Sequence, residues 1–164
     1  MDAREIFEGP NSKCMWWLSR RGPDDWHRSA LTYNWDNSLK PLLWIVSQAG
    51  CDRGTAITLY HRGQPEFFAR YETLSELEAE CAHETEAVEL LVRIANRWAA
   101  GGYTDYGFKP DLSFATIDLN ARPPWPVSAD LEDPVIQGKD LSLSRFADGL
   151  PVDFLDELQM RDFG

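Results

Sequence analysis

The histidines are the residues of this sequence best suited to proton transfer or metal binding. His83 and Glu86 lie three positions apart, a spacing that could hold a metal on one helix face if a second such pair faced them. No second pair is visible in the sequence. His27 and His61 lack a sequence-adjacent partner and are interpreted as surface or capping residues. A catalytic triad stays open as an alternative, since its members need not be adjacent. We predict no catalytic residue and no metal site.

Carboxylates are the more abundant candidates for binding chemistry. The glutamates from residue 72 to residue 89 follow one another without an intervening base, and further acids lie near the C-terminus. Trp125 stands between two prolines and is either an anchor for a partner or a residue that pins its loop to the core. For every acidic residue, the alternative role is solubility. The predicted partner-binding residues are Glu76, Glu78, Glu80, Glu84, Glu86, Trp125, Asp130, Glu132, Asp133, Asp140, Asp153, Asp156 and Glu157.

The balance of charge favours a basic protein as the partner. The 164 residues carry 27 acidic and 16 basic side chains, for a net charge of −11, and the whole excess lies after residue 50. Affinity for nucleic acid and for anionic membranes comes from Lys and Arg, so we predict neither as a partner. The glycines form no phosphate-binding loop and the acids show no calcium-loop spacing, and we therefore predict no cofactor.

Length and composition are typical of one folded domain. Apolar types make up 43% of the residues and charged types 26%, which is ordinary globular usage. We predict a single domain over 1–164, with a helical core at 27–110 and an acidic, proline-rich wrapping segment at 104–164. The oligomeric state stays open.

The same sequence favours a cytoplasmic protein. Its first residues lack the apolar core of a signal peptide, and the longest uncharged apolar stretch, 42–46, is far too short to span a membrane. Cys14, Cys51 and Cys81 are odd in number and widely spaced, which fits reduced thiols better than a disulfide framework. Two of the three are expected to be small core residues.

Helices must position these side chains in the first hundred residues. Residues 13–20 predict a short helix, and Pro23 suits the first position of a second one. A third helix is predicted over 38–49, with Gly50 as a left-handed stop, and Asp52 caps a fourth that ends at Gly63. The fold class is therefore mainly α, built from helical hairpins.

A further helix is predicted from a capping box formed by Ser75 and Glu78. It either continues through or breaks near His83, and then runs to Gly101. Residues 64–73 fit no period and are left without an element. Most prolines lie after residue 100, so that part is predicted to be irregular. Within this irregular part we predict a small β-hairpin around Gly138 and Lys139 and a helical turn at 151–158.

Three short stretches carry a resemblance to a known family. They read Tyr-Asn-Trp-Asp-Asn at 33–37, Cys-Asp-Arg-Gly-Thr-Ala at 51–56 and Ile-Ala-Asn-Arg-Trp-Ala-Ala-Gly-Gly-Tyr at 94–103. Over about residues 27–110 the chain resembles the bacterial domain-of-unknown-function family numbered four-two-seven-four. It departs from that family at 37–38, where Asp-Gly is expected, and at 102–103. The resemblance implies a helical domain and a bacterial cytoplasm, and no reaction.

The motif residues have structural interpretations. Asn34 and Asp36 satisfy the backbone of a turn between two helices, Asp52 caps a helix, and Gly54 lets that helix approach a neighbour closely. The whole structural motif comprises Asn34, Trp35, Asp36, Cys51, Asp52, Gly54 and Thr55. Replacing Asp52 by Ala is expected to cost about 1 kcal/mol as a lost cap, without removing a specific activity.

Acidity, small size and the absence of a catalytic pattern favour a non-enzymatic binding protein. Our first hypothesis is a bacterial immunity protein that binds and neutralises a cognate secreted toxin, such as a nuclease with a basic active site. The alternative is a helical-hairpin adaptor that binds a peptide or protein in a groove between helices. A convex acidic patch would favour the first function, and a concave apolar groove without an acidic rim would favour the second. An enzyme is third, and a deep pocket with His27 or His83 beside a carboxylate would favour it.

Overall fold

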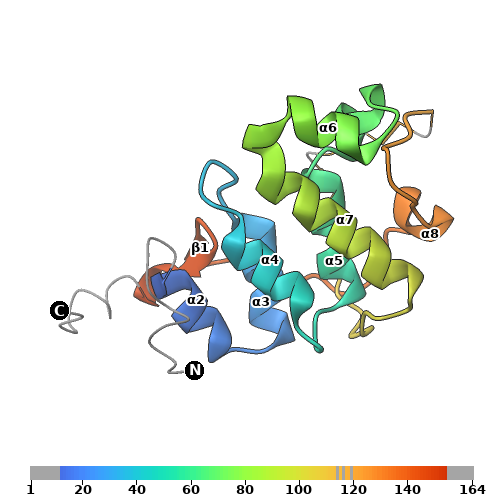
Figure 1. Cartoon of the computed structure of the whole chain (residues 1–164). Coiled ribbons are helices and arrows are strands. Elements are labelled where there is room, and N and C mark those ends of the chain that lie inside the picture. Colours follow the sequence, from blue (N-terminus) through green and yellow to red (C-terminus); the bar gives the residue numbers. More distant parts are fainter. Residues whose placement is uncertain (1–11, 114, 116, 119, 155–164) are drawn as a thin grey trace.

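Helices occupy the first hundred residues of the computed structural model, which describes residues 12–113, 115, 117–118 and 120–154 (Figure 1). They are α2 (Ser12–Ser19), α3 (Pro23–Thr32), α4 (Lys40–Ser47), α5 (Arg53–Arg62), η1 (Pro65–Arg70), α6 (Leu74–Glu80), η2 (Ala82–Glu84) and α7 (Thr85–Ala99). The later part holds α8 (Ala129–Glu132) and a two-stranded antiparallel hairpin, β1 (Phe146–Ala147) and β2 (Leu150–Pro151). The prediction of a mainly helical fold with a small C-terminal hairpin is confirmed.

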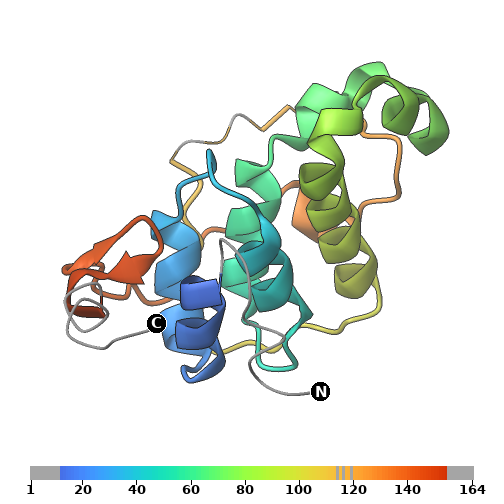
Figure 2. The same ribbon diagram turned by 60° about the vertical axis from the view of Figure 1, so that its left-hand side comes forward.

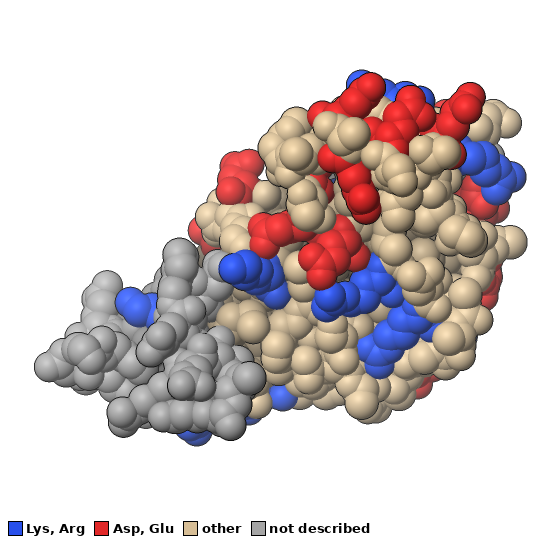
Figure 3. Space-filling model, viewed as in Figure 1, with Lys and Arg blue, Asp and Glu red and all other residues tan. Residues whose placement is uncertain are grey.

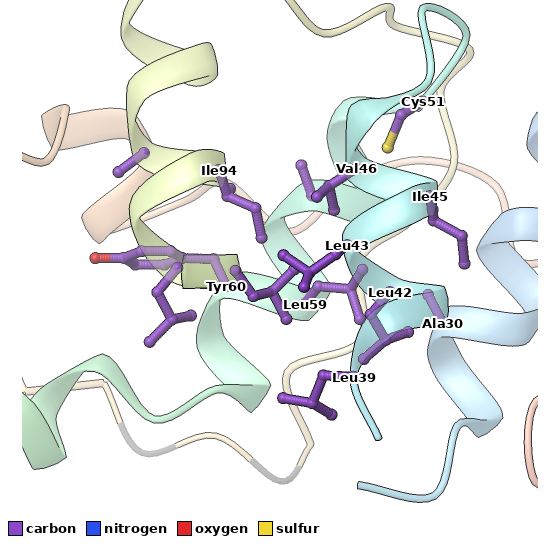
Figure 4. Close-up of a cluster of buried hydrophobic side chains, with 14 of the residues drawn as sticks. Ala30, Leu39, Leu42, Leu43, Ile45, Val46, Cys51, Leu59, Tyr60 and Ile94 are labelled. Atoms are coloured by element: carbon purple, nitrogen blue, oxygen red, sulfur yellow. The ribbon is translucent and has the colours of Figure 1, made fainter. Parts of the chain in front are cut away.

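Five helices of the described residues pack together around the core. Helix α5 packs against α3 and α7, and α4 packs against α7 and α2. Leu42, Leu59 and Ile94 are fully buried where α4, α5 and α7 meet (Figure 4). Truncating one such leucine to Ala typically costs about 2 to 5 kcal/mol, so this contact fixes the relative positions of the helices.

The end of α4 differs from its predicted form. The helix stops at Ser47 because Gln48 is extended, and Gly50 does not have a left-handed φ. The last carbonyls of α4 are satisfied by side chains instead. Gln48 donates its amide to the carbonyl of Trp44, and Arg97 donates to the carbonyl of Val46. With these donors in place, the chain needs no left-handed glycine there.

The beginning of α6 is also shifted from the prediction. Its N-cap is Thr73, whose hydroxyl oxygen accepts the backbone N–H of Glu76 at 3.1 Å, and not Ser75. The Glu76 carboxylate in turn accepts the N–H of Glu72 at 3.4 Å. Threonine and glutamate therefore have capping-box spacing two residues earlier than predicted. Of the two alternatives left open near His83, the structure has the break, as the short helix η2 between α6 and α7.

Residues 64–73, for which the sequence predicted no element, contain the 3₁₀-helix η1. Pro65, Phe68 and Tyr71 are buried, whereas Phe67 is exposed. Their spacing of three matches the three residues per turn of a 3₁₀-helix. This spacing matches neither the period of 2 of a strand nor the period of 3.6 of an α-helix.

The hairpin lies at a different place from the predicted one. Asp148 (φ 52°) and Gly149 (φ 85°) form the turn between β1 and β2, as in an Asp-Gly type I′ turn. The predicted hairpin around Gly138 and Lys139 is wrong. Lys139 instead pairs with the chain near Phe108, donating to the carbonyl of Gly107 at 2.8 Å. The helical turn predicted at 151–158 extends beyond the described residues.

The segment after α7 runs across the helical part to both of its ends. Strands β1 and β2 lie beside α2 and α3, while α8 lies at the opposite end, near α7 (Figures 1 and 2). Trp125 is buried at 7% exposure, and its Nε1 donates to the hydroxyl of Tyr60 at 3.2 Å. The segment thus packs against the core that α5 helps to form. Within the described residues, no helix has the length and apolar character needed to cross a membrane.

Candidate protein-binding surface

The motif at 51–56 builds the start of α5 and ties it to the later loop. Asp52 is buried at 1% exposure, and its carboxylate accepts the N–H of Gly54 at 2.7 Å and that of Tyr106 at 2.6 Å. Burial raises the pKa of Asp52, while the two backbone amides oppose that shift. Asp52 is therefore more than an N-cap, because it also holds residue 106 against the helix.

Gly54 allows the close approach that the sequence predicts, although its neighbour is a loop rather than a helix. A Cβ atom on Gly54 would lie 2.0 Å from the carbonyl oxygen of Phe108. Cys51 is fully buried, and burial raises the pKa of its thiol to about 12. Cys81 is also buried, so two of the three cysteines are core residues.

The first motif forms the connection between α3 and α4. The side-chain oxygen of Asn34 accepts the N–H of Asp36 at 3.0 Å, which closes an Asx-turn. Trp35 is half-buried in the same turn, and Asp36 is exposed. Both motifs thus provide local backbone geometry.

His27 and His61 are buried, so their interpretation as surface or capping residues is wrong. Nδ1 of His27 lies 2.8 Å from Thr55 Oγ1, and Nε2 lies 3.1 Å from the carbonyl oxygen of Lys109. Nε2 of His61 lies 2.7 Å from the carbonyl oxygen of Leu131. Burial lowers the pKa of both imidazoles, that of His27 to about 4. These neutral rings link α3 and α5 to the later segment.

The His27–Thr55 pair resembles a base beside a hydroxyl, yet a substrate could not reach it. Thr55 is 0% exposed and His27 is 1% exposed. Exposed His83, in contrast, lies 3.6 Å from the carboxylate of its own neighbour Glu84. Among the described residues, no cluster of three or more His, Cys, Asp and Glu side chains is arranged to hold a metal ion.

The carboxylates of α6 form the exposed acidic patch of this structure. Glu76, Glu78 and Glu80 are all exposed. Within the part of the chain that the structure describes, none of the three is in an ion pair. Figure 3 shows acidic atoms gathered at this end of the molecule. We call Glu76, Glu78 and Glu80 the α6 acidic patch.

Two predicted partner-binding residues have internal roles instead. Glu86 accepts hydrogen bonds from the Ser38 hydroxyl at 3.1 Å and from the Leu39 N–H at 3.2 Å, and so caps the beginning of α4. Trp125 packs in the core against Phe68 and Tyr60, as the alternative reading of its loop proposed. Both side chains therefore make contacts within the protein.

Three of the predicted partner-binding acids of the later segment, Asp130, Glu132 and Asp153, are in ion pairs. Asp130 accepts from Trp98 Nε1 at 2.9 Å and lies 3.5 Å from Arg53. Glu132 pairs with Arg122 at 2.7 Å, and Asp153 pairs with Arg145 at 2.6 Å. Asp133 and Asp140 are exposed. Asp156 and Glu157 lie outside the described residues.

A groove of about 910 Å³ lies between α6 and α7, next to the α6 acidic patch. The apolar residues that line it are Leu74, Leu77, Cys81, Val88 and Val92. Leu74 and Val92 are half-buried, so part of this floor contacts solvent. The apolar lining residues recur at i, i+3 and i+7 from Leu74 to Cys81, and at i and i+4 on α7, spacings that place them on one face of each helix.

The two edges of the groove differ in charge. The α6 edge carries Glu78 of the acidic patch. On the α7 edge, Arg93 lies 2.6 Å from Glu89, and Arg97 donates to the carbonyls of Val46 and Gly102. Figure 3 shows this contrast, with basic atoms below the acidic end. The groove therefore has one negative edge and one edge with compensated or positive charge.

Comparison with known proteins confirms the family resemblance. Residues 21–99 match the model of a family described as Domain of unknown function (DUF4274). No curated protein and no solved structure matches the chain significantly. The matched range begins just before α3 and ends with α7, so it contains the α5 motif, the α6 acidic patch and the groove. Residues 21–99 of this chain are therefore similar to the DUF4274 family.

Proposed function

We propose that the protein is a non-enzymatic, acidic binding protein that neutralises a basic partner, most concretely a bacterial immunity protein that acts in the cytoplasm against a cognate secreted toxin. The observation that carries this proposal is the α6 acidic patch, whose three exposed carboxylates have no ion-pair partner in the described part of the chain. Carboxylates left unpaired at a surface are available to a positively charged partner.

Electrostatics favour such a function. A patch of one sign accelerates encounter with a patch of the opposite sign and disfavours partners of like charge. Enzymes that cleave nucleic acid present basic clefts to phosphate, and a row of carboxylates on one helix can occupy such a cleft. The net charge of −11 adds a long-range attraction to the local contacts.

The second candidate function is a helical-hairpin adaptor, and the groove between α6 and α7 favours it. Its floor is apolar and concave, as a peptide-binding site requires, but its α6 edge is acidic. The two functions thus share one face of the molecule. They differ in their consequence for the partner, since an immunity protein abolishes the partner's activity and an adaptor leaves it unchanged.

Two double variants, each of which removes two negative charges, test the proposal and locate the surface that binds the partner. Glu78→Gln with Glu80→Gln removes two charges from the α6 acidic patch. Asp133→Asn with Asp140→Asn removes two from the later segment and serves as the control. The partner probed is the purified product of the gene adjacent to this one, with dissociation constants measured at low and high salt.

We expect the α6 double variant to bind about tenfold more weakly at low salt, with a reduced dependence on salt, and the control to bind like the wild type. Protection of cells that produce the neighbouring product then separates an immunity protein from an adaptor. If the adjacent gene product forms no complex at low salt, the immunity proposal is abandoned. If only the control variant loses affinity, the α6 acidic patch is not the binding surface.

A further inference from the structure

The groove between α6 and α7 has the features of a helix pair that lacks a third helix. Leu74 and Leu77 face it from α6, and Val88 and Val92 face it from α7. Side chains three or four positions apart lie on one side of a helix, so each helix presents a single apolar stripe to the same space. Half-buried Leu74 and Val92 leave the outer part of that space open to solvent.

A helix fits this groove better than an extended peptide, because the groove offers no backbone hydrogen bonds to a ligand. The walls are helices, whose backbone N–H and C=O groups are bonded within each helix and offer no edge to a strand. The paired strands β1 and β2 lie at the other end of the molecule, beside α2 and α3. A docked helix would pair its own backbone groups internally and would bring only side chains to the groove.

The charges along the two edges restrict which helix fits. The α6 edge is negative through Glu78. On the α7 edge, Glu89 is neutralised by Arg93. Arg97 donates to backbone carbonyl oxygens and lies over the Tyr103 ring, and among the described residues it is in no ion pair. Lysine or arginine would be attracted to the first edge, and would meet positive charge at the second.

We propose that the groove between α6 and α7 binds one amphipathic helix of the partner protein, with an apolar stripe on the groove floor, Lys and Arg along the edge that faces α6, and acidic or uncharged side chains along the edge that faces α7. This inference rests on the proposed function and specifies the part of the partner that is recognised. A helix that carries bases on both edges fits less well.

Two synthetic helical peptides of identical composition provide the direct test. Both have a leucine stripe, and one has its lysines on one edge and its glutamates on the other, whereas the second has them mixed on both edges. A helix can lie in the groove in either of two opposite directions. The lysines of the segregated peptide can therefore face α6 whichever side of the leucine stripe they occupy. Binding of fluorescently labelled peptide to the full chain is measured by anisotropy.

We expect the segregated peptide to bind about tenfold more tightly than the mixed one, and Glu78→Gln with Glu80→Gln to remove this preference. Val92→Arg places a charge on the groove floor and should abolish binding. Ala99→Arg, on the same helix but not in the groove, is the matched control and should bind like the wild type. Thermal unfolding followed by circular dichroism verifies that both variants fold.

Equal binding of the two peptides, no binding of either, or unchanged binding by Val92→Arg would overturn the inference. The proposed function is judged separately, with the adjacent gene product. If that product binds the wild type and Val92→Arg equally, the helix proposal fails while the binding function stands. If it forms no complex while the segregated peptide binds as described, the binding function fails and the groove chemistry stands.

Discussion

Nδ1 of His27 lies 2.8 Å from Oγ1 of Thr55, inside the contact between α3 and α5. The other ring nitrogen, Nε2, faces the carbonyl oxygen of Lys109, which can only accept a hydrogen bond. Nε2 therefore carries the proton, and the threonine hydroxyl donates to Nδ1. This assignment requires a neutral imidazole, in agreement with a pKa that burial lowers to about 4.

The stability of the protein should fall on acidification because of His27. Its pKa is about 4 in the folded protein and 6.5 in an exposed histidine, so between these values the unfolded chain binds the extra proton. Stability is full above pH 6.5 and decreases as the pH falls towards 4, by roughly 3 kcal/mol when fully developed. The difference between the free energies of unfolding at pH 7 and at pH 5, measured by urea denaturation, gives this loss. His27→Gln, which retains one donor and one acceptor, should lose less stability over the same interval, and an equal loss would contradict the assignment.

Asp52→Ala should destabilise the protein more than an ordinary N-cap variant. Two backbone N–H groups, those of Gly54 and Tyr106, would lose their acceptor in a buried place, at a cost of about 3 kcal/mol. Thr73→Ala removes a single capping bond at an exposed site and should cost about 1 kcal/mol. Denaturant unfolding of the two variants gives this comparison. Equal losses would mean that the bond to Tyr106 contributes little, as the sequence-based value for Asp52 assumed.

Gly54→Ala tests the close approach of α5 to the loop at Phe108. The new methyl group would lie 2.0 Å from a backbone carbonyl oxygen, so the loop must move, and we expect a loss of about 2 kcal/mol or more. Gly101→Ala is the control, because its φ of 70° is strained for alanine but its surroundings are open. It should lose about 1 kcal/mol. Thermal unfolding of both variants measures the difference, and a neutral Gly54→Ala would show that the loop is free to shift.

The sequence predicted those elements whose signals are local. Pro23 at the first helical position and Asp52 as a cap depend on near neighbours, and they stand where they were expected. The hairpin was misplaced because Gly138 has a turn-like sequence but its neighbour Lys139 bonds to Gly107, 32 residues earlier in the chain. Local turn propensity cannot reveal such a distant partner.

The candidate site was predictable in part for the same reason. The acidic run at α6 is visible in the sequence, and its exposure follows from helix periodicity. The internal roles of Glu86 and Trp125 depend on Ser38 and Tyr60, which lie far from them in the sequence. The burial of His27 likewise depends on Lys109. Charge alone therefore could not separate the carboxylates that hold the fold together from those that remain exposed.

Relief of repulsion in the α6 acidic patch gives a last prediction, which connects stability with function. Glu76 and Glu80 are four positions apart on α6, where like charges repel, and Glu80 also lies at the negative C-terminal end of the helix. Glu80→Gln should therefore raise the free energy of unfolding by about 0.5 kcal/mol. Glu78→Gln is the control, because the residues four positions away, Leu74 and Ala82, are uncharged. Denaturant unfolding of both variants measures the difference.

Both variants should nevertheless weaken binding of the adjacent gene product. A carboxylate that costs stability and strengthens binding has a function in recognition, whereas unchanged affinity in both variants would leave solubility as the role of the patch.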